Sequence, residues 1–565
     1  MRRTTWGFRS WAPCIWAIAA FAFASHSPVA AQDVSPQAVP SEQAREIRRG
    51  EAQARQERHR QVEIAADPAG RSGAHRLPAD AVTRHTVEAP RRTLHFTATA
   101  GALPITNGQG RVLAEMAYIA YALNGADPLQ RPVTFAFNGG PGSASAWLHL
   151  GGLGPWRLPM NGQATSPSTP PSLMPNEETW LDFTDLVFID PVGTGYSRVV
   201  KSGEPAEAGA SGRNGSANGS RETGGTRYFW SVDGDVESIS DFMLNWLQKS
   251  GRIGSPKILV GESYGGFRAP KIAQTLQTRH GVGLSAIVLV SPVLDFAGRR
   301  GGRTPLSYVS LLPSLAAAAI EKRGQTPTRA ALAAAEEYAR GEYLTDLMRG
   351  GRGKAAVDRV VAKVAQFTGL PDPIVRRYGG RIDGQTYNRE TNRPEGKVAS
   401  MYDASITGFD PDPTAPNPRF NDPFTAALNA PMTSAMLDLY RTKLNWRPDG
   451  RYLKSNWEAN RNWIWGNSPV PPESVSELRS VLALDPRLRV LVAHGFTDLV
   501  TPYLASELIL DQIPDYGGEE RLGTVVYPGG HMFYSRDSSR RAFREDVLKL
   551  IERSIGGAPP QKMAP

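Results

Sequence analysis

A serine stands between two glycines in the segment VGESYGG, residues 260–266, directly after the apolar run ILV. The pattern G-x-S-x-G between a strand and a helix is typical of a sharp turn that exposes a nucleophilic serine hydroxyl. A glycine-rich turn with an incidental serine is the alternative, because so short a pattern also occurs by chance. The run before it predicts a strand and residues 267–277 predict a helix, so the sequence favours Ser263 as a nucleophile.

A serine hydroxyl needs a general base, and three of the nine histidines follow Ser263 in the chain: His280, His494 and His531. A serine on this kind of turn takes its partners in the chain order serine, acid, histidine. His280 ends the helix after the serine, and His494 precedes the best acid candidate. His531 directly follows the apolar segment TVVYPGG and is the predicted base, with a surface-loop histidine as the alternative.

Asp498 is the predicted acid, because it lies three residues after RVLVAHG, a run that predicts a strand. The carboxyl ends of parallel strands meet at one edge of a sheet, where ligands bind. Ser263, Asp498 and His531 would then come together at that edge. Asp511 and Asp515 also lie between this strand and the histidine, and they remain alternatives.

A glycine-rich segment, NGGPGS at residues 138–143, follows the apolar run VTFAF. Three glycines and a proline at a strand end expose backbone N–H groups, which are the donors that an oxyanion hole needs. An ordinary tight turn has the same composition, so this segment alone does not decide between the two.

Six short apolar runs predict the strands that must position these residues. Uninterrupted runs of about five Val, Ile and Leu are typical of strands buried on both faces, as in a parallel sheet. Residues 236–249 carry apolar side chains at spacings of three and four, which predicts an amphipathic crossover helix. Strand and helix alternate, so we expect a doubly wound, mostly parallel α/β sheet. The runs are residues 133–137, 186–190, 257–261, 286–290, 489–495 and 524–530.

A long insertion interrupts this pattern. Residues 297–430 are rich in alanine with helical periodicity, and they predict a helical cap over the sheet. Two stretches rich in Gly, Ser and Pro, residues 163–175 and 201–225, predict mobile surface loops. The remaining divisions are a first core part at 86–296, a second core part at 431–556 and a flexible tail at 557–565.

The N-terminus predicts export. Residues 1–31 have basic residues, an apolar centre too short to span a bilayer and small residues before Gln32, as in a secretory signal peptide. Residues 32–85 are polar and predict a flexible arm, a propeptide or a solvated helix. The only cysteine, Cys14, lies within the signal, so we expect a periplasmic or secreted bacterial protein without a membrane span after cleavage.

Composition narrows the function class. With 565 residues, 40% of them hydrophobic, the chain can fold as one large domain with insertions or as two domains. The formal net charge is +9, but no basic run interleaved with aromatics occurs, so we interpret the charge as a solvated surface and expect no nucleic-acid partner. No His or Cys spacing of a metal site occurs, and GTGYS lacks the lysine and helix of a phosphate loop; no cofactor is expected. The oligomeric state is not predicted.

Four segments in fixed order carry a family resemblance: NGGPGSAS, DPVGTGYS at residues 190–197, GESYGG, and GGHM at residues 529–532. Together they resemble the serine carboxypeptidase family over residues 86–296 and 430–555. NEETW, before LVFIDPVGTGYS, is similar to another segment of that family. The resemblance implies an α/β-hydrolase fold with a helical cap and hydrolysis of peptides from the C-terminus through an acyl-enzyme.

The resemblance also implies roles for single residues. Ser263 would be the nucleophile, His531 the general base and then acid, and Asp498 the residue that orients the histidine. The N–H groups of Gly140 and Tyr264 would hold the oxyanion.

A carboxylate-binding site is implied as well, in altered form. Asn138 and Glu262 would recognise the substrate's terminal carboxylate. The family usually has a tryptophan where this chain has Ala136, and a second glutamate where it has Gly152. Because paired carboxylic acids bind a carboxylate best at low pH, Gly152 weakens the case for an acidic optimum and for strict carboxypeptidase specificity. An esterase, aminopeptidase or acyltransferase with the same triad is the alternative, and a non-catalytic binding protein is the third possibility.

Overall fold

The computed structural model describes residues 76–89, 92–160, 166–168, 170, 172–200, 225–299, 304–415, 421–516 and 521–556. The predicted signal peptide 1–31, most of the predicted arm 32–85, the tail beyond 556 and large parts of the two predicted loops lie outside these residues. Those assignments stay predictions. The described residues all belong to one compact unit, Ala74–Pro565.

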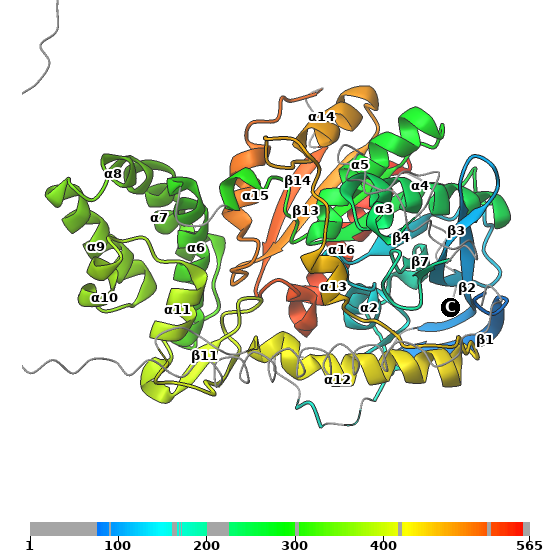
Figure 1. Ribbon diagram of the computed structural model, residues 1–565, viewed down its shortest axis with the longest axis horizontal. Helices are drawn as coiled ribbons and strands as arrows, with labels where there is room; N and C mark the ends of the chain where they lie inside the picture. The colour runs from blue at the N-terminus through cyan, green and yellow to red at the C-terminus, as the bar shows by residue number, and fades with distance from the viewer. Residues whose placement is uncertain are drawn as a thin grey trace, which may run out of the picture. The chain divides into compact units, whose positions relative to one another are not determined.

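A ten-stranded sheet forms the centre of this unit (Figure 1). Its order is β1-β2-β3-β7-β4-β9-β10-β13-β14, and the short β8 pairs with β3. Neighbours from β7 to β14 are parallel, whereas the pairs from β1 to β7 are antiparallel. The strands are β1 (Ala81–Ala89), β2 (Arg92–Thr106), β3 (Val112–Leu123), β4 (Val133–Phe137), β7 (Asp185–Ile189), β8 (Arg198–Val199), β9 (Lys257–Glu262), β10 (Ala286–Val290), β13 (Arg489–Gly495) and β14 (Leu522–Tyr527).

The central strands are buried on both faces, which explains their uninterrupted apolar sequences. Every residue of β4, β7, β9 and β10 is buried. Successive side chains of a strand point to opposite faces. Ile258 and Val260 of β9 therefore join one hydrophobic cluster, while Leu259 between them joins the other. Full burial of each such side chain contributes about 1.5–3 kcal/mol.

Helices cover both faces of the sheet. Helices α4, α5 and α14 contribute to the cluster that contains Leu259, and α12 and α16 contribute to the opposite cluster. Their bounds, with those of the shorter helices of the core, are α2 (Ala146–Leu148), α3 (Thr226–Phe229), α4 (Val232–Lys249), α5 (Tyr264–Arg279), α12 (Pro423–Asp438), α13 (Trp457–Arg461), α14 (Val475–Leu484), α15 (Tyr503–Leu510) and α16 (Asp537–Ser554). The predicted doubly wound, mostly parallel α/β sheet is confirmed.

The antiparallel part, β1 to β3, was not predicted. Its longest strand, β2, alternates between buried and exposed positions for much of its length. Such a strand has no continuous apolar run. The other strands were predicted from runs of that kind. In addition, β1 begins at Ala81, so the ordered core starts before the predicted boundary at residue 86.

A helical insertion lies between β10 and α12. Its helices are α6 (Pro305–Lys322), α7 (Arg329–Tyr338), α8 (Leu344–Arg349), α9 (Lys354–Thr368), α10 (Asp372–Arg377) and α11 (Gly384–Glu390). They share a hydrophobic cluster that includes Leu315 and Val361, and Tyr503 and Leu504 of α15 join it from the core. The predicted boundary at residues 430–431 falls inside α12, which continues to Asp438.

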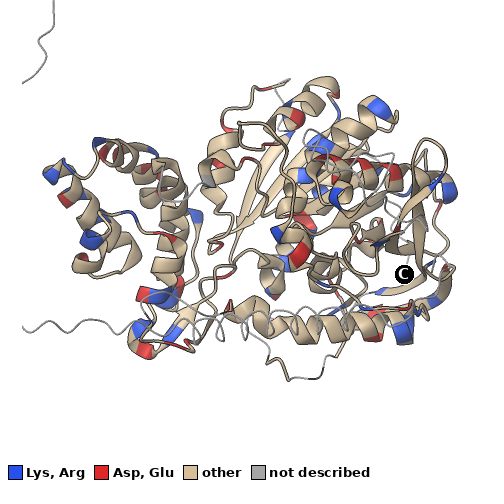
Figure 2. Ribbon diagram, in the orientation of Figure 1, with Lys and Arg blue, Asp and Glu red and all other residues tan. Residues whose placement is uncertain are grey.

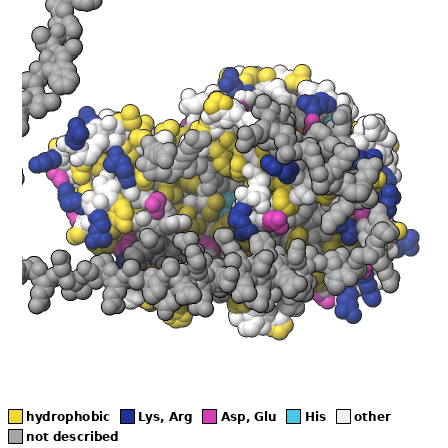
Figure 3. Space-filling view, viewed as in Figure 1, with side chains coloured by type: hydrophobic (Ala, Val, Ile, Leu, Met, Phe, Trp, Pro, Cys, Tyr) yellow, Lys and Arg dark blue, Asp and Glu magenta, His cyan; other side chains and the backbone are white. Residues whose placement is uncertain are grey.

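Two short antiparallel strand pairs lie outside the large sheet: β5 (Trp156–Arg157) with β6 (Met174–Pro175), and β11 (Lys397–Ala399) with β12 (Thr407–Phe409). Along the ribbon, Lys and Arg positions are interspersed with Asp and Glu positions in both the insertion and the core (Figure 2). On the face shown in Figure 3, hydrophobic side chains lie among the charged residues of the insertion.

Among the described residues, no helix has the length and apolar character needed to cross a membrane.

Candidate active site

Ser263 occupies a strained turn between β9 and α5. Its backbone dihedrals are φ 61° and ψ −121°, values that non-glycine residues rarely adopt. Such a conformation costs of order 1–3 kcal/mol and persists only where the surroundings impose it. Here the Ser263 N–H donates to the Val290 carbonyl at 2.9 Å, which ties the turn to the end of β10. The turn has the geometry that the sequence pattern predicted.

Glycines are required around this turn because backbone segments approach one another closely. A Cβ on Gly261 would lie 2.2 Å from the Gly265 carbonyl oxygen. A Cβ on Gly139 would lie 2.4 Å from the Tyr264 nitrogen. No side chain fits at either position, so the two glycine-rich segments seen in the sequence pack directly against each other.

His531 and Asp498 form a buried pair beyond the ends of β14 and β13. His531 Nδ1 lies 2.7 Å from Asp498 Oδ2, and both residues are almost fully buried. The other carboxylate oxygen, Oδ1, accepts the backbone N–H groups of Val500 and Thr501 at 2.8 and 2.9 Å. Burial alone would raise the pKa of Asp498, but His531 and these hydrogen bonds outweigh it and lower that pKa. The aspartate is therefore ionised beside the imidazole at neutral pH.

Thr501 contacts both residues of this pair, and the sequence did not identify it. Its hydroxyl lies 2.6 Å from Asp498 Oδ2 and 3.0 Å from His531 Nδ1. It also lies 2.9 Å from the Ser291 carbonyl oxygen, at the end of β10. Thr501 thus fixes the orientation of the aspartate. Its position three residues after an aspartate at a strand end was the available signal.

The loop that carries His531 is held by residues of the insertion. The His531 N–H donates to the Tyr402 carbonyl at 2.5 Å, and Asp403 accepts the Gly530 N–H at 3.2 Å. Arg536 then bridges Asp403 at 2.9 Å and Glu321 of α6 at 2.6 Å. The insertion therefore helps to position the imidazole.

The alternative histidines and acids lie elsewhere. His494 is fully buried against the Ser506 hydroxyl at 2.9 Å, and burial lowers its pKa to about 4. His280 ends α5 and lies 3.5 Å from Asp241. Asp511 pairs with Arg340 at 2.7 Å on the surface. Neither these residues nor Asp515 line the cleft that contains Ser263 and His531.

Ser263 and His531 line one cleft of about 940 Å³, which we call the active-site cleft. Its walls come from residues 138–143, from the serine turn, from the first turns of α12 and from residues 454–457 and 460. Trp147 and Trp465 add aromatic surface. Hydrogen-bonding groups and apolar surface are thus both present in the cleft, as in sites that bind organic ligands.

Two backbone amides beside Ser263 are available for an oxyanion. Gly140 and Tyr264 both line the cleft, and Tyr264 is the first residue of α5. Neither N–H donates a hydrogen bond to another described residue. A helix N-terminus also favours developing negative charge. The arrangement predicted from the sequence is therefore geometrically available.

Glu262 forms a buried hydrogen-bonded group with Asn138 and Tyr534 next to the serine. The Tyr534 hydroxyl donates to Glu262 Oε2, and Asn138 hydrogen-bonds the same carboxyl group. Burial raises the pKa of Glu262 to about 7, although His531, Tyr534 and Asn138 each lower it. The Glu262 carboxyl group therefore changes between its protonated and ionised forms near neutral pH.

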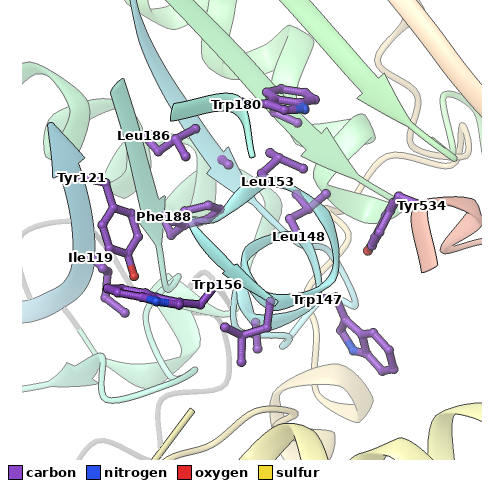
Figure 4. Packing of buried hydrophobic residues seen from close by; sticks show 14 of the residues in the cluster. Ile119, Tyr121, Trp147, Leu148, Leu153, Trp156, Trp180, Leu186, Phe188 and Tyr534 are labelled. Carbon is purple, nitrogen blue, oxygen red and sulfur yellow. The ribbon is translucent and has the colours of Figure 1, made fainter. Parts of the chain in front are cut away.

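Tyr534 explains how the chain accommodates Gly152. The aromatic ring packs over the Gly151–Gly152 backbone: a Cβ on Gly152 would meet the ring at 3.3 Å, and one on Gly151 at 2.6 Å. Figure 4 shows Tyr534 beside the helical segment that contains Leu148. A tyrosine hydroxyl therefore reaches Glu262 from the space that a longer side chain at position 152 would need. Sequence reasoning missed Tyr534, whose only signal was its position three residues after His531.

Among the described residues, no group of three or more His, Cys, Asp or Glu side chains has the geometry to hold a metal ion. The site is instead built from a hydroxyl, an imidazole, two carboxyl groups and backbone amides.

Two curated proteins named as carboxypeptidases are similar to parts of this chain. Serine carboxypeptidase-like 36 of Arabidopsis thaliana is 28% identical over 29% of this chain and 29% of its own length. Pheromone-processing carboxypeptidase KEX1 of Coprinopsis cinerea is 25% identical over 70% of this chain and 53% of its own length. The chain thus matches only about a third and a half of the lengths of these relatives.

A solved proline iminopeptidase from Mycobacterium smegmatis matches 80% of this chain and 99% of its own, at 14% identity and a TM-score of 0.33. The family model described as serine carboxypeptidase matches residues 90–310, which include Ser263 and residues 138–143 but neither Asp498 nor His531. By this match residues 90–310 of the chain are similar to the serine carboxypeptidase family.

Proposed function

We propose that this protein is a serine-type carboxypeptidase that removes C-terminal residues from peptides. The observation that carries the proposal is the placement of Glu262, a buried carboxyl group with a pKa raised to about 7, directly beside Ser263 in the active-site cleft. A protonated carboxyl group can donate a hydrogen bond to a carboxylate, and the C-terminal end of a peptide presents one next to the last peptide bond.

In the proposed reaction Ser263 attacks the scissile carbonyl and transfers its proton to His531. Asp498 accepts the Nδ1–H of the imidazole, so Nε2 is the nitrogen that would take that proton. The N–H groups of Gly140 and Tyr264 stabilise the oxyanion. His531 then gives the proton to the departing amino acid, and water hydrolyses the acyl-enzyme by the same steps in reverse.

Glu262 and Asn138 would bind the terminal carboxylate of the substrate. Below pH 7 Glu262 is protonated and attracts the carboxylate. Above pH 7 it is ionised and repels it, so binding weakens as the pH rises through the pKa. Tyr534 donates to Glu262 and stays neutral, so one titrating acid controls binding rather than the family's usual pair.

Another serine hydrolase is the alternative, and one observation favours it. The position of the family's second glutamate is Gly152, and its space is filled by a tyrosine ring. An esterase or acyltransferase with the same nucleophile would not depend on the ionisation of Glu262. The pH dependence therefore separates the two functions.

Glu262→Gln tests the proposal. For the wild type, titration of one acid with a pKa of about 7 lowers the ratio of kcat/KM for a peptide to kcat/KM for an uncharged ester about tenfold between pH 6 and pH 8. Glutamine remains neutral, so the ratio for the variant is expected to become independent of pH. Measuring both substrates over this range gives the ratio directly, and the ester cancels pH effects on the catalytic steps that both substrates share.

Glu507→Gln is the matched control. Glu507 is also a carboxyl group with a raised pKa, caused by burial, but it pairs with Arg329 and does not line the cleft. Its variant should keep the wild-type ratio at each pH. Equal pH profiles for peptide and ester in the wild type would reject a carboxylate-binding role for Glu262 and favour the esterase alternative.

A further inference from the structure

Lys454 places a cation in the wall of the active-site cleft. The side chain lines the cleft and is almost fully buried, with 6% of the residue exposed. Its Nζ lies 5.0 Å above the centre of the Trp147 ring. None of the described residues provides a carboxylate or a hydrogen-bond acceptor to this ammonium group. Burial lowers the pKa of Lys454 to about 8, so the group is mostly charged at neutral pH.

The carboxyl groups of the cleft wall already have partners. Asp422 accepts the N–H groups of Met401, Phe424 and Thr425 at 2.8–3.1 Å and the Ser400 hydroxyl at 2.9 Å. Glu262 is bound by Tyr534 and Asn138, as described above. Among the described charged residues that line the cleft, Lys454 alone lacks a polar partner for its charged group. A buried cation without an anion is costly, and a bound anion would remove that cost.

The backbone fixes Lys454 next to residues 138–143. Its carbonyl accepts the Ala144 N–H at 2.9 Å, and Ser455 forms a bridge with Ser143. The side chain then reaches Trp147 on α2. The ammonium group therefore lies at the part of the cleft wall formed by Trp147, just after residues 138–143 in the chain.

The part of the cleft wall that contains Trp147 is next to the proposed carboxylate site. Trp147 precedes Leu148, whose N–H donates to Asn138 Oδ1 at 3.1 Å. A peptide whose terminal carboxylate lies at Asn138 and Glu262 would direct the side chain of its last residue toward this part of the cleft. In the view of Figure 4, Trp147 and Tyr534 both lie to the right of the helical segment that contains Leu148.

We propose that Lys454 binds the acidic side chain of a C-terminal glutamate or aspartate and makes the protein selective for peptides that end in these residues. The proposal rests on the proposed function. The ammonium and the substrate carboxylate form an ion pair in a largely buried wall, where a charge-assisted hydrogen bond is stronger than at the surface. The Trp147 ring supports the cation from the other side.

Two peptides that differ only in their last residue, glutamate or glutamine, test this selectivity. The wild type is expected to hydrolyse the glutamate peptide with a kcat/KM roughly tenfold higher, the effect of one hydrogen bond to a charged group. In Lys454→Met, which keeps an unbranched side chain but removes the ammonium group, the ratio should fall to about one. Lys454→Arg should retain part of the preference. A ratio near one in the wild type, or an unchanged ratio in Lys454→Met, would overturn the proposal.

Lys443→Met is the matched control. Lys443 makes an equivalent contact, with Nζ 4.8 Å from the centre of the Trp156 ring, but it does not line the cleft. Its variant should keep the wild-type ratio. Thermal unfolding of both variants separates a loss of selectivity from a loss of the fold.

A binding readout distinguishes failure of this proposal from failure of the proposed function. The same two peptides are tested for protection of Ser263 from a fluorophosphonate, which needs binding but no peptide hydrolysis. Stronger protection by the glutamate peptide, lost in Lys454→Met, would support Lys454 even if neither peptide were cleaved. Equal protection by both peptides would reject Lys454 whether or not peptides are substrates.

Discussion

Replacing Ser263 by alanine is expected to lower kcat for peptides and esters by roughly 10⁵-fold, because the variant lacks the oxygen that forms the acyl-enzyme. The strained turn should remain, because the Ser263 N–H that holds it to Val290 is unchanged, so the variant should fold as the wild type does. The oxyanion amides are unchanged, and they would leave a small residual rate. Steady-state hydrolysis of one peptide and one ester measures the loss.

Ser455→Ala is the control for this prediction, because Ser455 lines the same cleft without contacting His531 or Asp498. It should retain most of the wild-type kcat. If Ser263→Ala kept more than about one hundredth of the wild-type rate, Ser263 would not be the nucleophile.

Replacing Asp498 by asparagine is expected to lower kcat about 10³- to 10⁴-fold, the second-largest loss. The amide retains the size of the side chain, but it removes the negative charge 2.7 Å from His531 Nδ1 and can hold the imidazole in the wrong tautomer. Substrate binding does not involve Asp498, so KM should change little. Kinetics of Asp498→Asn on the same peptide and ester give both quantities.

Asp511→Asn provides the matched comparison, because Asp511 was one of the two alternative acids between the strand and the histidine. It pairs with Arg340 on the surface, so its loss should leave kcat near the wild-type value. A large loss in Asp511→Asn together with a small loss in Asp498→Asn would reverse the assignment of the orienting acid.

The sequence predicted the buried part of the fold well because that part has a strong local signal. The runs that became β4, β9 and β10 are apolar at every position or nearly so, since both faces of these strands are covered. Strands β1 and β2 lie at the antiparallel end of the sheet, and β2 alternates between buried and more exposed positions. Their alternating side chains resemble those of many exposed segments, and their pairing depends on distant parts of the chain.

The position of the nucleophile could also be predicted, because the turn needs a local sequence. Gly261, Ser263 and Gly265 lie within five consecutive residues. A Cβ atom at either glycine would clash with nearby backbone atoms, which explains why both positions are glycine. His531 and Asp498 followed from their positions after predicted strands and from chain order. Their contact at 2.7 Å agrees with that placement, while the kinetic predictions above test the roles.

The parts of the site that escaped prediction come from segments that meet only in three dimensions. Tyr534 reaches Glu262 from 272 residues away in the chain, and Lys454 lies beside residues 138–143 through a backbone pairing with Ala144. Neither residue belongs to a pattern with a local structural requirement. The substitution at Gly152 was visible in the sequence, but the ring that fills the space was not.

The most direct test of carboxypeptidase action is a mass-spectrometric time course on matched peptides with free and amidated C-termini at pH 6. We expect single residues to be lost in steps from the free C-termini only, and no loss with Ser263→Ala. Cleavage of the amidated peptides at the same rate, or hydrolysis of esters without hydrolysis of peptides, would contradict the account.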